Sequence, residues 1–252
     1  MEEGIYTSAM LVGLGLAPSL VWLFYYLKKD PRPEPRYMIS RVFLLGITLA
    51  PIAVIAQWVF REAVLTFKPE YQILTSVPFF LWAAFIEETV KFLPVKFAVL
   101  HNPEFDEPVD AMIYMIAAAL GFAAIENILV LFQAIPDGAS ATLQIWSLRF
   151  IGATLLHAVS SALVGYFLAL SWFYNRHSQK LVFIGIAIAT LFHFAFNYVI
   201  LKGGERPTSF LYSTVLLIAA AIIISFLFAK IKGRIGGKIK IKDSLSTEAT
   251  LP

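Results

Sequence analysis

Seven long apolar runs constrain this chain more than any other feature of its sequence. Each has about the twenty residues that a helix needs to cross a bilayer. Hydrophobic residues fill 59% of the 252 positions and charged residues only 15%, whereas a soluble domain has about a quarter charged residues. We therefore expect an all-α, multi-pass helical bundle in the cell membrane. The runs cover residues 5–27, 39–59, 78–100, 111–134, 147–173, 181–201 and 210–229.

Lysine and arginine are distributed unevenly between the two ends of these runs, thirteen on one side and five on the other. Cytoplasmic loops carry the excess of basic residues, which predicts an N-terminus outside and a C-terminus in the cytoplasm. We expect a membrane domain over residues 1–230 and a cytoplasmic tail over 231–252, disordered from Asp243. The basic stretch from Lys230 to Lys242 follows a span directly, as segments that bind anionic lipid do.

Two other classes of function are disfavoured by composition. The net charge is +3, but no basic stripe is interleaved with exposed aromatic residues, so we expect no nucleic-acid partner. The chain has no cysteine, which excludes disulfides, thiolate metal sites and a cysteine nucleophile. Any catalysis must use carboxylates, histidines or hydroxyl groups.

Charged residues inside two of the apolar runs are the strongest functional signal. Glu87, Glu88 and Lys91 lie within the third run, and Glu126 lies within the fourth. One ionisable residue at the bilayer centre costs about 3 kcal/mol, so these side chains must face one another or water. Such residues in a membrane span are a functional-site hypothesis by default.

Two histidines extend this polar set. His157 and His193 each stand four residues before a polar residue, Ser161 and Asn197, which places each pair on one helix face. Counted from the ends of the runs, the buried acids and both histidines lie about 12 to 15 Å below the outer boundary. The orientation was chosen without these residues, and they predict one polar layer in the outer half of the bilayer.

The polar layer is compatible with several kinds of chemistry. A carboxylate can take a proton from water while an imidazole or amide stabilises an oxyanion. Glutamate and histidine are also ordinary zinc ligands, and chains of them relay protons in transporters. Alternatively, the polar groups only fix helix packing, for example through an ion pair between Glu87 and Lys91 at helix spacing of four. Spacing alone leaves these interpretations open.

Four motifs, in this order, resemble the PrsW family of intramembrane proteases. That family belongs to a wider group with the CaaX prenyl proteases and the bacteriocin-processing membrane enzymes. The motifs are EExxK at residues 87–91, the stretch 107–114 leading into FxxxE and Asn127 at residues 122–127, a histidine at 157, and HxxxN at residues 193–197. Each motif alone is weak, but together they form a specific signal.

The resemblance implies a glutamic-type peptide hydrolase that needs no metal and no other cofactor. Glu87 and Glu88 would supply the general base for water. His157, His193 and Asn197 would complete the water and oxyanion site. The predicted catalytic residues are Glu87, Glu88, Glu126, His157 and His193, and the predicted supporting residues are Lys91, Asn127, Ser161 and Asn197.

Two roles stay open within the resemblance. Glu126 stands where the CaaX relatives carry a histidine, and a glutamate donates a hydrogen bond only when it is protonated. The base is either Glu87 or Glu88. Helix spacing pairs Glu87 with Lys91, whereas the habit of the wider family makes the first glutamate the base.

Depth and resemblance together predict the substrate class. A site in the outer half of the bilayer favours an endopeptidase that cuts a single-pass membrane protein near its extracytoplasmic side. The resemblance implies site-one cleavage of a protein like an anti-sigma factor. The alternative function is a proton-coupled transporter that uses the Glu and His layer as a relay. Inverted-repeat halves with broken helices would favour transport, and no internal repeat is evident in the sequence.

Overall fold

The computed structural model describes residues 2–174, 177–203 and 207–248, and this part of the chain is helical and contains no strand. The expected all-α bundle is therefore confirmed. The longer helices are α1 (Glu2–Leu27), α2 (Arg36–Phe67), α3 (Val77–Ala98), α4 (Pro108–Ala134), α5 (Ala139–Ile151), α6 (Ala153–Ala169), α7 (Gln179–Gly203) and α8 (Pro207–Glu248). Shorter helical segments are η1 (Ile73–Thr75), η2 (Ile135–Asp137) and the π-helical η3 (Leu170–Tyr174).

Six helical stretches in the described residues are long and apolar enough to cross a membrane. They comprise α1, α2, α4, α7, most of the apolar part of α8, and α5 with α6 and η3 taken together. Helix α3 is 22 residues long but carries the charged residues of the third predicted run. The chain is thus a multi-pass membrane protein, and α3 brings Glu87, Glu88 and Lys91 into its interior.

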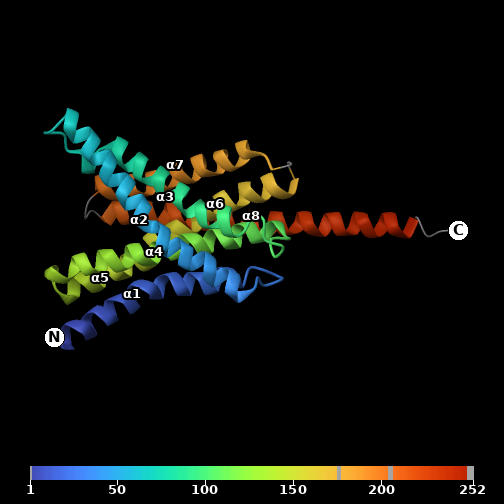
Figure 1. The fold of residues 1–252 in the computed structure, drawn as a ribbon, viewed down its shortest axis with the longest axis horizontal. Helices are drawn as coiled ribbons and strands as arrows, with labels where there is room; N and C mark the ends of the chain where they lie inside the picture. Colours follow the sequence, from blue (N-terminus) through green and yellow to red (C-terminus); the bar gives the residue numbers. More distant parts are fainter. Residues whose placement is uncertain (1, 175–176, 204–206, 249–252) are drawn as a thin grey trace.

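Helix α4 is the centre of the bundle. Its residues from Pro108 to Ala124 are all buried, and α1, α2 and α6 pack against it. Helix α2 crosses it obliquely (Figure 1). The two helices approach so closely that a Cβ at Gly121 would lie 2.0 Å from the carbonyl oxygen of Phe43, and one at Gly46 would lie 2.2 Å from that of Ala118. Glycine at these positions permits the backbone contact.

Local signals explain where the helices begin. Helix α2 starts directly after Pro35, and proline disfavours helix in the residue before it, so the proline-rich connector stays extended. Helix α3 begins after Ser76, whose hydroxyl accepts the N–H of Phe79 at 3.4 Å. At the start of α4 the carboxylate of Asp110 accepts the N–H of Glu107 at 2.7 Å. Both are helix-capping arrangements.

The fifth predicted span, residues 147–173, is wrong as a single helix. Helix α5 ends at Ile151 and α6 begins at Ala153, with Gly152 between them at φ −78° and ψ −85°. Glycine in a helix costs about 1 kcal/mol relative to alanine, and a hydropathy window does not detect a bend. His157 is therefore the fifth residue of α6, and its depth cannot be counted from residue 147.

Helix α8 extends past the other helices at the C-terminal end (Figure 1). It continues as one helix across residue 230 to Glu248, where the sequence predicted disorder from Asp243, and residues 249–252 lie outside the described residues. The division at residue 230, the orientation in the membrane and the contact of the basic tail with anionic lipid stay predictions.

Candidate functional site

The structure brings the five predicted catalytic side chains together inside the bundle. Helix α3 supplies Glu87 and Glu88, α4 supplies Glu126, α6 supplies His157 and α7 supplies His193. Nδ1 of His193 lies 2.8 Å from Oε1 of Glu88, and Nε2 of His157 lies 2.8 Å from Oε2 of Glu126. The two imidazole rings meet edge to face, with centroids 5.2 Å apart. We call these five residues the polar cluster.

Glu88 is completely buried and its oxygens are occupied. Oε1 accepts hydrogen bonds from Lys91 at 2.8 Å and from Ser160 at 2.9 Å, besides its contact with His193. Oε2 accepts the hydroxyl of Ser161 at 3.2 Å. The contacts of Lys91 and Ser161 place two predicted supporting residues against Glu88. A carboxylate held this way is an anchor for its neighbours rather than an open base.

Glu87 has one carboxylate oxygen without a hydrogen-bond partner. Its Oε1 accepts the amide N–H of Gln57 at 3.2 Å, whereas the buried Oε2 accepts none. Nε2 of His193 lies 3.7 Å from that oxygen, and Nζ of Lys91 lies 3.8 Å from it. The Glu87–Lys91 pair considered from the sequence is therefore the longer of the two contacts of Lys91. Glu87 is the glutamate with room to accept a proton.

Arg149 of α5 holds the other edge of the cluster. Its Nη2 donates to Glu126 Oε2 at 2.8 Å, and its Nε donates to Asn127 Oδ1 at 2.7 Å. The amide of Asn127 donates in turn to the hydroxyl of Thr154 at 3.0 Å. Glu126 thus receives the guanidinium and the ring of His157 on one oxygen. Its side chain is 34% exposed, so this edge is the more accessible one.

Asn197, the remaining predicted supporting residue, lies apart from these contacts. It stands one turn after His193 on α7 and lines a cavity of about 610 Å³ between α4, α5, α6, α7 and α8. Arg149 lines the same cavity, so the cavity reaches the exposed edge of the polar cluster. The rest of its wall is mainly apolar, and includes Leu148, Leu155, Phe196, Ile200, Leu217 and Ile218.

The sequence analysis did not predict four residues that contact the polar cluster or its supporting residue Asn127. They are Gln57, Arg149, Thr154 and Ser160. Arg149 looked like a loop residue because a hydropathy window placed it near the end of a span, and Gln57 stood alone in an apolar run. Ser160 and Thr154 are hydroxyl residues in a helix, where they commonly bond their own preceding turn. Depth gave no signal for Gln57, because it lies only two residues from the outer end of the predicted run 39–59. The contacts themselves join residues between 22 and 72 positions apart.

The donor types in the cluster fit a divalent metal ion. Glu87, His157 and His193 each offer one ligand atom, and these atoms lie within 4.8 Å of one another. Glu87 Oε2 and His157 Nδ1 are buried atoms with no hydrogen-bond partner. Glutamate and histidine are zinc ligands, so the residues fit such an ion. The expectation of a metal-independent site stays a prediction.

The charge balance of the same cluster is close to neutral. Three carboxylates, those of Glu87, Glu88 and Glu126, face the cations Lys91 and Arg149. One negative charge is left, which either a bound proton or a divalent ion would offset.

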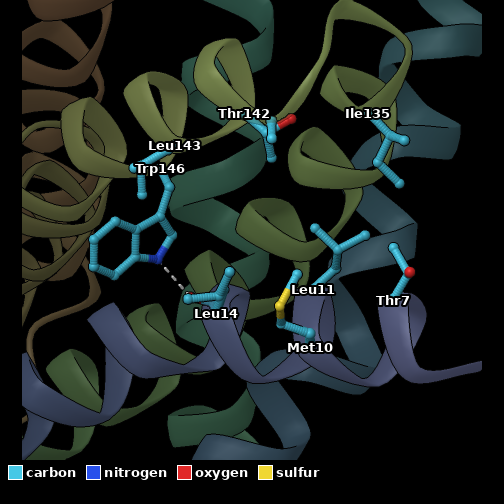
Figure 2. Close-up of a pocket in the computed structure, with 9 residues that line it drawn as sticks. Thr7, Met10, Leu11, Leu14, Ile135, Thr142, Leu143 and Trp146 are labelled. Atoms are coloured by element: carbon cyan, nitrogen blue, oxygen red, sulfur yellow. Dashed lines mark hydrogen bonds between the residues drawn. The ribbon is translucent and has the colours of Figure 1, made fainter. Parts of the chain in front are cut away.

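A separate cavity of about 290 Å³ lies between α1 and α5 (Figure 2). Its described lining has no titratable side chain. The indole N–H of Trp146 donates to the carbonyl oxygen of Leu14 at 2.8 Å and closes one side (Figure 2). The lining residues are Thr7, Met10, Leu11, Leu14, Ile135, Ala139, Thr142, Leu143 and Trp146. This cavity belongs to the packing of α5 on α1 and offers no chemistry.

Carboxylates and imidazoles buried among membrane-spanning helices define the class of membrane proteins with an intramembrane acid–base site. The family described as "PrsW family intramembrane metalloprotease" matches residues 34–227. The chain therefore belongs to the PrsW family, as the four motifs indicated. It is an intramembrane protease, and its reaction is the hydrolysis of peptide bonds.

Curated relatives agree with the family match. The chain is 28% identical over 192 residues to the Protease PrsW of Geobacillus kaustophilus, covering 76% of this chain and 80% of that protein. It is 30% identical over 194 residues to the Protease PrsW of Oceanobacillus iheyensis, covering 77% and 83%. With the Protease PrsW of Bacillus subtilis it shares 26% over 192 residues, covering 75% and 82%. No solved structure gives a significant match.

Proposed function

We propose that the chain is an endopeptidase that cuts a single-pass membrane protein near its extracytoplasmic side, with a water activated by Glu87. The observation that carries the proposal is the buried Oε2 of Glu87, which accepts no hydrogen bond. A general base needs an oxygen within hydrogen-bond reach of the proton it takes. Glu88 is the poorer base because both of its oxygens already accept hydrogen bonds.

The proposed reaction uses the neighbouring imidazoles. Glu87 takes a proton from the water, and the hydroxide adds to the scissile carbonyl carbon. The carbon–nitrogen bond then breaks, and a proton is delivered to the leaving amine. His193 is placed for this transfer because its Nε2 lies 3.7 Å from Glu87 Oε2 while its Nδ1 contacts Glu88. The products are a carboxyl end and an amino end.

His157 supports the developing negative charge in this mechanism. Its Nε2 contacts Glu126, and its Nδ1 is buried with no partner. When the ring is protonated, Nδ1 can donate to the oxyanion, and such a fixed donor is worth most where water is excluded. Arg149 holds Glu126 in place and so keeps the ring of His157 oriented. If a divalent ion is supplied, Glu87, His157 and His193 would hold it, and it would polarise the scissile carbonyl.

The cavity beside the cluster supports the extracytoplasmic cleavage position. It includes Ile200 near the end of α7 and Ser213 near the start of α8, and the distribution of basic residues predicts that these ends lie outside. Its apolar wall suits the end of a membrane-spanning segment, while Arg149 and Asn197 offer polar contacts to a peptide backbone. We infer that the substrate reaches Glu87 through this cavity. Site-one cleavage of a protein like an anti-sigma factor is the family activity that this geometry suits.

The test compares new protein N-termini in cells that express the wild type, Glu87→Gln or Glu70→Gln at equal abundance. Glu70 is an exposed carboxylate in the loop after α2 and serves as the matched control. The proposal predicts fragments that begin near the extracytoplasmic end of a membrane span with the wild type and the control, and none with Glu87→Gln. Identical fragment sets in all three strains would overturn it, and proton-flux assays on the same proteins would then test transport.

A further inference from the structure

A second group of buried acids lies at the other end of α4. It comprises Asp30 and Glu34 from the α1–α2 connector, Glu107 just before α4 and Asp110 in its first turn, and we call these four residues the acidic cluster. Asp30 and Glu107 are each 6% exposed, and Asp110 is fully buried. One carboxylate oxygen from each of these three lies within 4.8 Å of the other two. The proposed peptidase mechanism does not use them.

Two of these carboxylates have one oxygen fixed and the other unpartnered. Asp30 accepts the N–H of Arg32 on Oδ1 at 3.0 Å, and its buried Oδ2 accepts nothing. Asp110 accepts the N–H groups of Asp106 and Glu107 on Oδ2, at 3.1 and 2.7 Å, and its carboxyl also interacts with that of Glu34, but its buried Oδ1 accepts no hydrogen bond. Helix capping thus gives a role to Oδ2 of Asp110, but it leaves the buried Oδ1 without one. A buried acceptor without a donor costs about 1 to 3 kcal/mol, and more when charged.

The cations near the acidic cluster do not balance the negative charges of its carboxylates. Nη1 of Arg32 lies 2.5 Å from Oε1 of Glu107. The ammonium of Lys232 donates to the backbone carbonyl of Lys29 and favours the ionised form of Asp30. In the described part of the chain these two cations face the four carboxylates of the acidic cluster and the nearby carboxylate of Asp106. When these acids are ionised, their negative charges outnumber the cations by enough to balance one divalent cation.

The fourth acid of the acidic cluster, Glu34, is part of this excess. It accepts the hydroxyl of Tyr114 and faces Asp110. Burial, together with neighbouring carboxylates, raises the pKa of Glu34, Glu107 and Asp30 above their ordinary values. The fold therefore holds these acids where ionisation is unfavourable unless a cation accompanies them.

We propose that the acidic cluster binds one hard divalent cation, Mg²⁺ or Ca²⁺, through carboxylate oxygens of Asp30, Glu107 and Asp110. The donor set contains only oxygen, which is the preference of these two ions. A bound ion would join the α1–α2 connector to the first turn of α4, the central helix. The predicted orientation places it on the cytoplasmic face. It would thus be separate from any metal held by Glu87, His157 and His193.

The first experiment measures the thermal unfolding temperature of the purified full-length protein after removal of metals by a chelator. Mg²⁺ and Ca²⁺ are then titrated in separate arms, because an ion that binds only the folded state raises the unfolding temperature with saturation. The arm that saturates at the lower concentration identifies the preferred ion. The absence of a saturable rise with either ion would overturn the proposal.

Three variants test whether the rise in unfolding temperature comes from an ion bound at the acidic cluster. Asp30→Asn keeps an oxygen for the N–H of Arg32 but removes a charge, so the rise should disappear while the metal-free variant stays at least as stable as the metal-free wild type. Glu104→Gln changes an exposed acid in the α3–α4 connector, three residues before Glu107, and should keep the full rise. Glu87→Gln should also keep it. A rise that survives in Asp30→Asn, or one that is lost in Glu87→Gln, would place the ion elsewhere and contradict the proposal.

Discussion

The ammonium of Lys91 lies 2.8 Å from Oε1 of Glu88, and neither side chain is exposed to solvent. The two residues are three positions apart on α3. This ion pair makes the two adjacent glutamates differ in how their carboxylates are partnered. Lys91 donates to Glu88 at close range but lies 3.8 Å from Glu87. The EExxK motif therefore contains one anchored carboxylate and one open carboxylate.

The pair predicts that the two glutamates affect stability differently. Glu88→Gln leaves the buried charge of Lys91 without its close partner, and breaking a buried pair in this way costs about 3 to 5 kcal/mol. Glu87→Gln removes an oxygen that makes no hydrogen bond, so we expect a change of less than about 1 kcal/mol. The free energy of unfolding in detergent measures both. The double variant Glu88→Gln, Lys91→Met should recover part of the loss, and equal destabilisation by the two single variants would contradict this assignment.

Arg149 should act as a positioning residue for Glu126 and His157. Arg149→Lys keeps the charge but cannot donate to both Glu126 and Asn127, because lysine lacks the planar fork of the guanidinium. A displacement of about 1 Å in a site can cost about 100-fold in rate, so we expect kcat for a reporter substrate to fall by about 10- to 100-fold with little change in unfolding temperature. Arg61→Lys, near the far end of α2, is the control. An unchanged kcat would remove Arg149 from the mechanism.

The close contact between α2 and α4 should be intolerant of one added methyl group. Gly121→Ala would place a Cβ 2.0 Å from the carbonyl oxygen of Phe43, and overpacking costs about 1 to 3 kcal/mol. At Gly13 on α1 no atom lies within 4 Å of an added Cβ, and alanine is the better helix former. We expect Gly121→Ala to lower the unfolding temperature and Gly13→Ala to maintain or raise it. Equal responses would show that the helices do not pack as described.

Metal dependence separates two forms of the catalytic mechanism. A water activated by Glu87 alone predicts that cleavage of a reporter continues after treatment with o-phenanthroline in a buffer that retains Mg²⁺. The m-phenanthroline isomer, which does not chelate, is the control for binding of the ring system. A loss of activity with the chelating isomer alone, restored by zinc, would instead make Glu87, His157 and His193 metal ligands.

The acidic cluster predicts a pH dependence of opposite sign to that of an ordinary ion pair. Because the pKa of Asp30 is raised on folding, the folded chain binds that proton more tightly than the unfolded chain. Its contribution to the free energy of unfolding therefore decreases as pH rises above 3.8, the ordinary pKa of an aspartate side chain, and levels off once the group is ionised. The charged and titratable groups that face the acidic cluster are Arg32, Asp106, Tyr114 and Lys232.

The difference in unfolding free energy between Asp30→Asn and the wild type isolates this contribution. Without divalent ions, the variant should gain stability relative to the wild type as pH rises from acidic to neutral. Saturating ion should reverse the order at neutral pH, because only the wild type then binds it. A difference that is constant with pH, or one of the opposite sign, would mean that the carboxyl of Asp30 is not destabilised by burial.

Much of the helical bundle and of the polar cluster could be predicted from the sequence, because a polar residue is easily recognised within an apolar membrane span. The apolar runs predicted the bundle, and the rarity of charge within them indicated the residues that meet in the polar cluster. The break at Gly152 was not predictable from hydropathy, because both flanking segments are apolar. Because the break was not predicted, Arg149 was counted at the end of a single long span. It lies instead on the short helix α5, which packs beside the polar cluster.

The acidic cluster could not be predicted for a different reason. Three of its members come from two connectors about 75 residues apart and the fourth, Asp110, from the first turn of α4, and acids in connectors are ordinarily solvated. Only the position of the proline-rich connector against the start of α4 buries them. Resemblance directed attention to the stretch containing Glu107 and Asp110 but gave no partner for it, because Asp30 lies outside the four motifs.

Helix α4 carries Asp110 in its first turn and Glu126 sixteen residues later, about 24 Å along a straight helix. The residues between them from Met112 to Leu120 have at most 1% exposure, so the helix is clamped along this length and can move only as a stiff rod. A slide by a single residue rise, about 1.5 Å, would separate Glu126 from the 2.8 Å contacts that it makes with His157 and Arg149. The acidic cluster and the polar cluster are thus joined by one tightly packed helix, so that a displacement of the α1–α2 connector along the axis of α4 would misalign the catalytic groups.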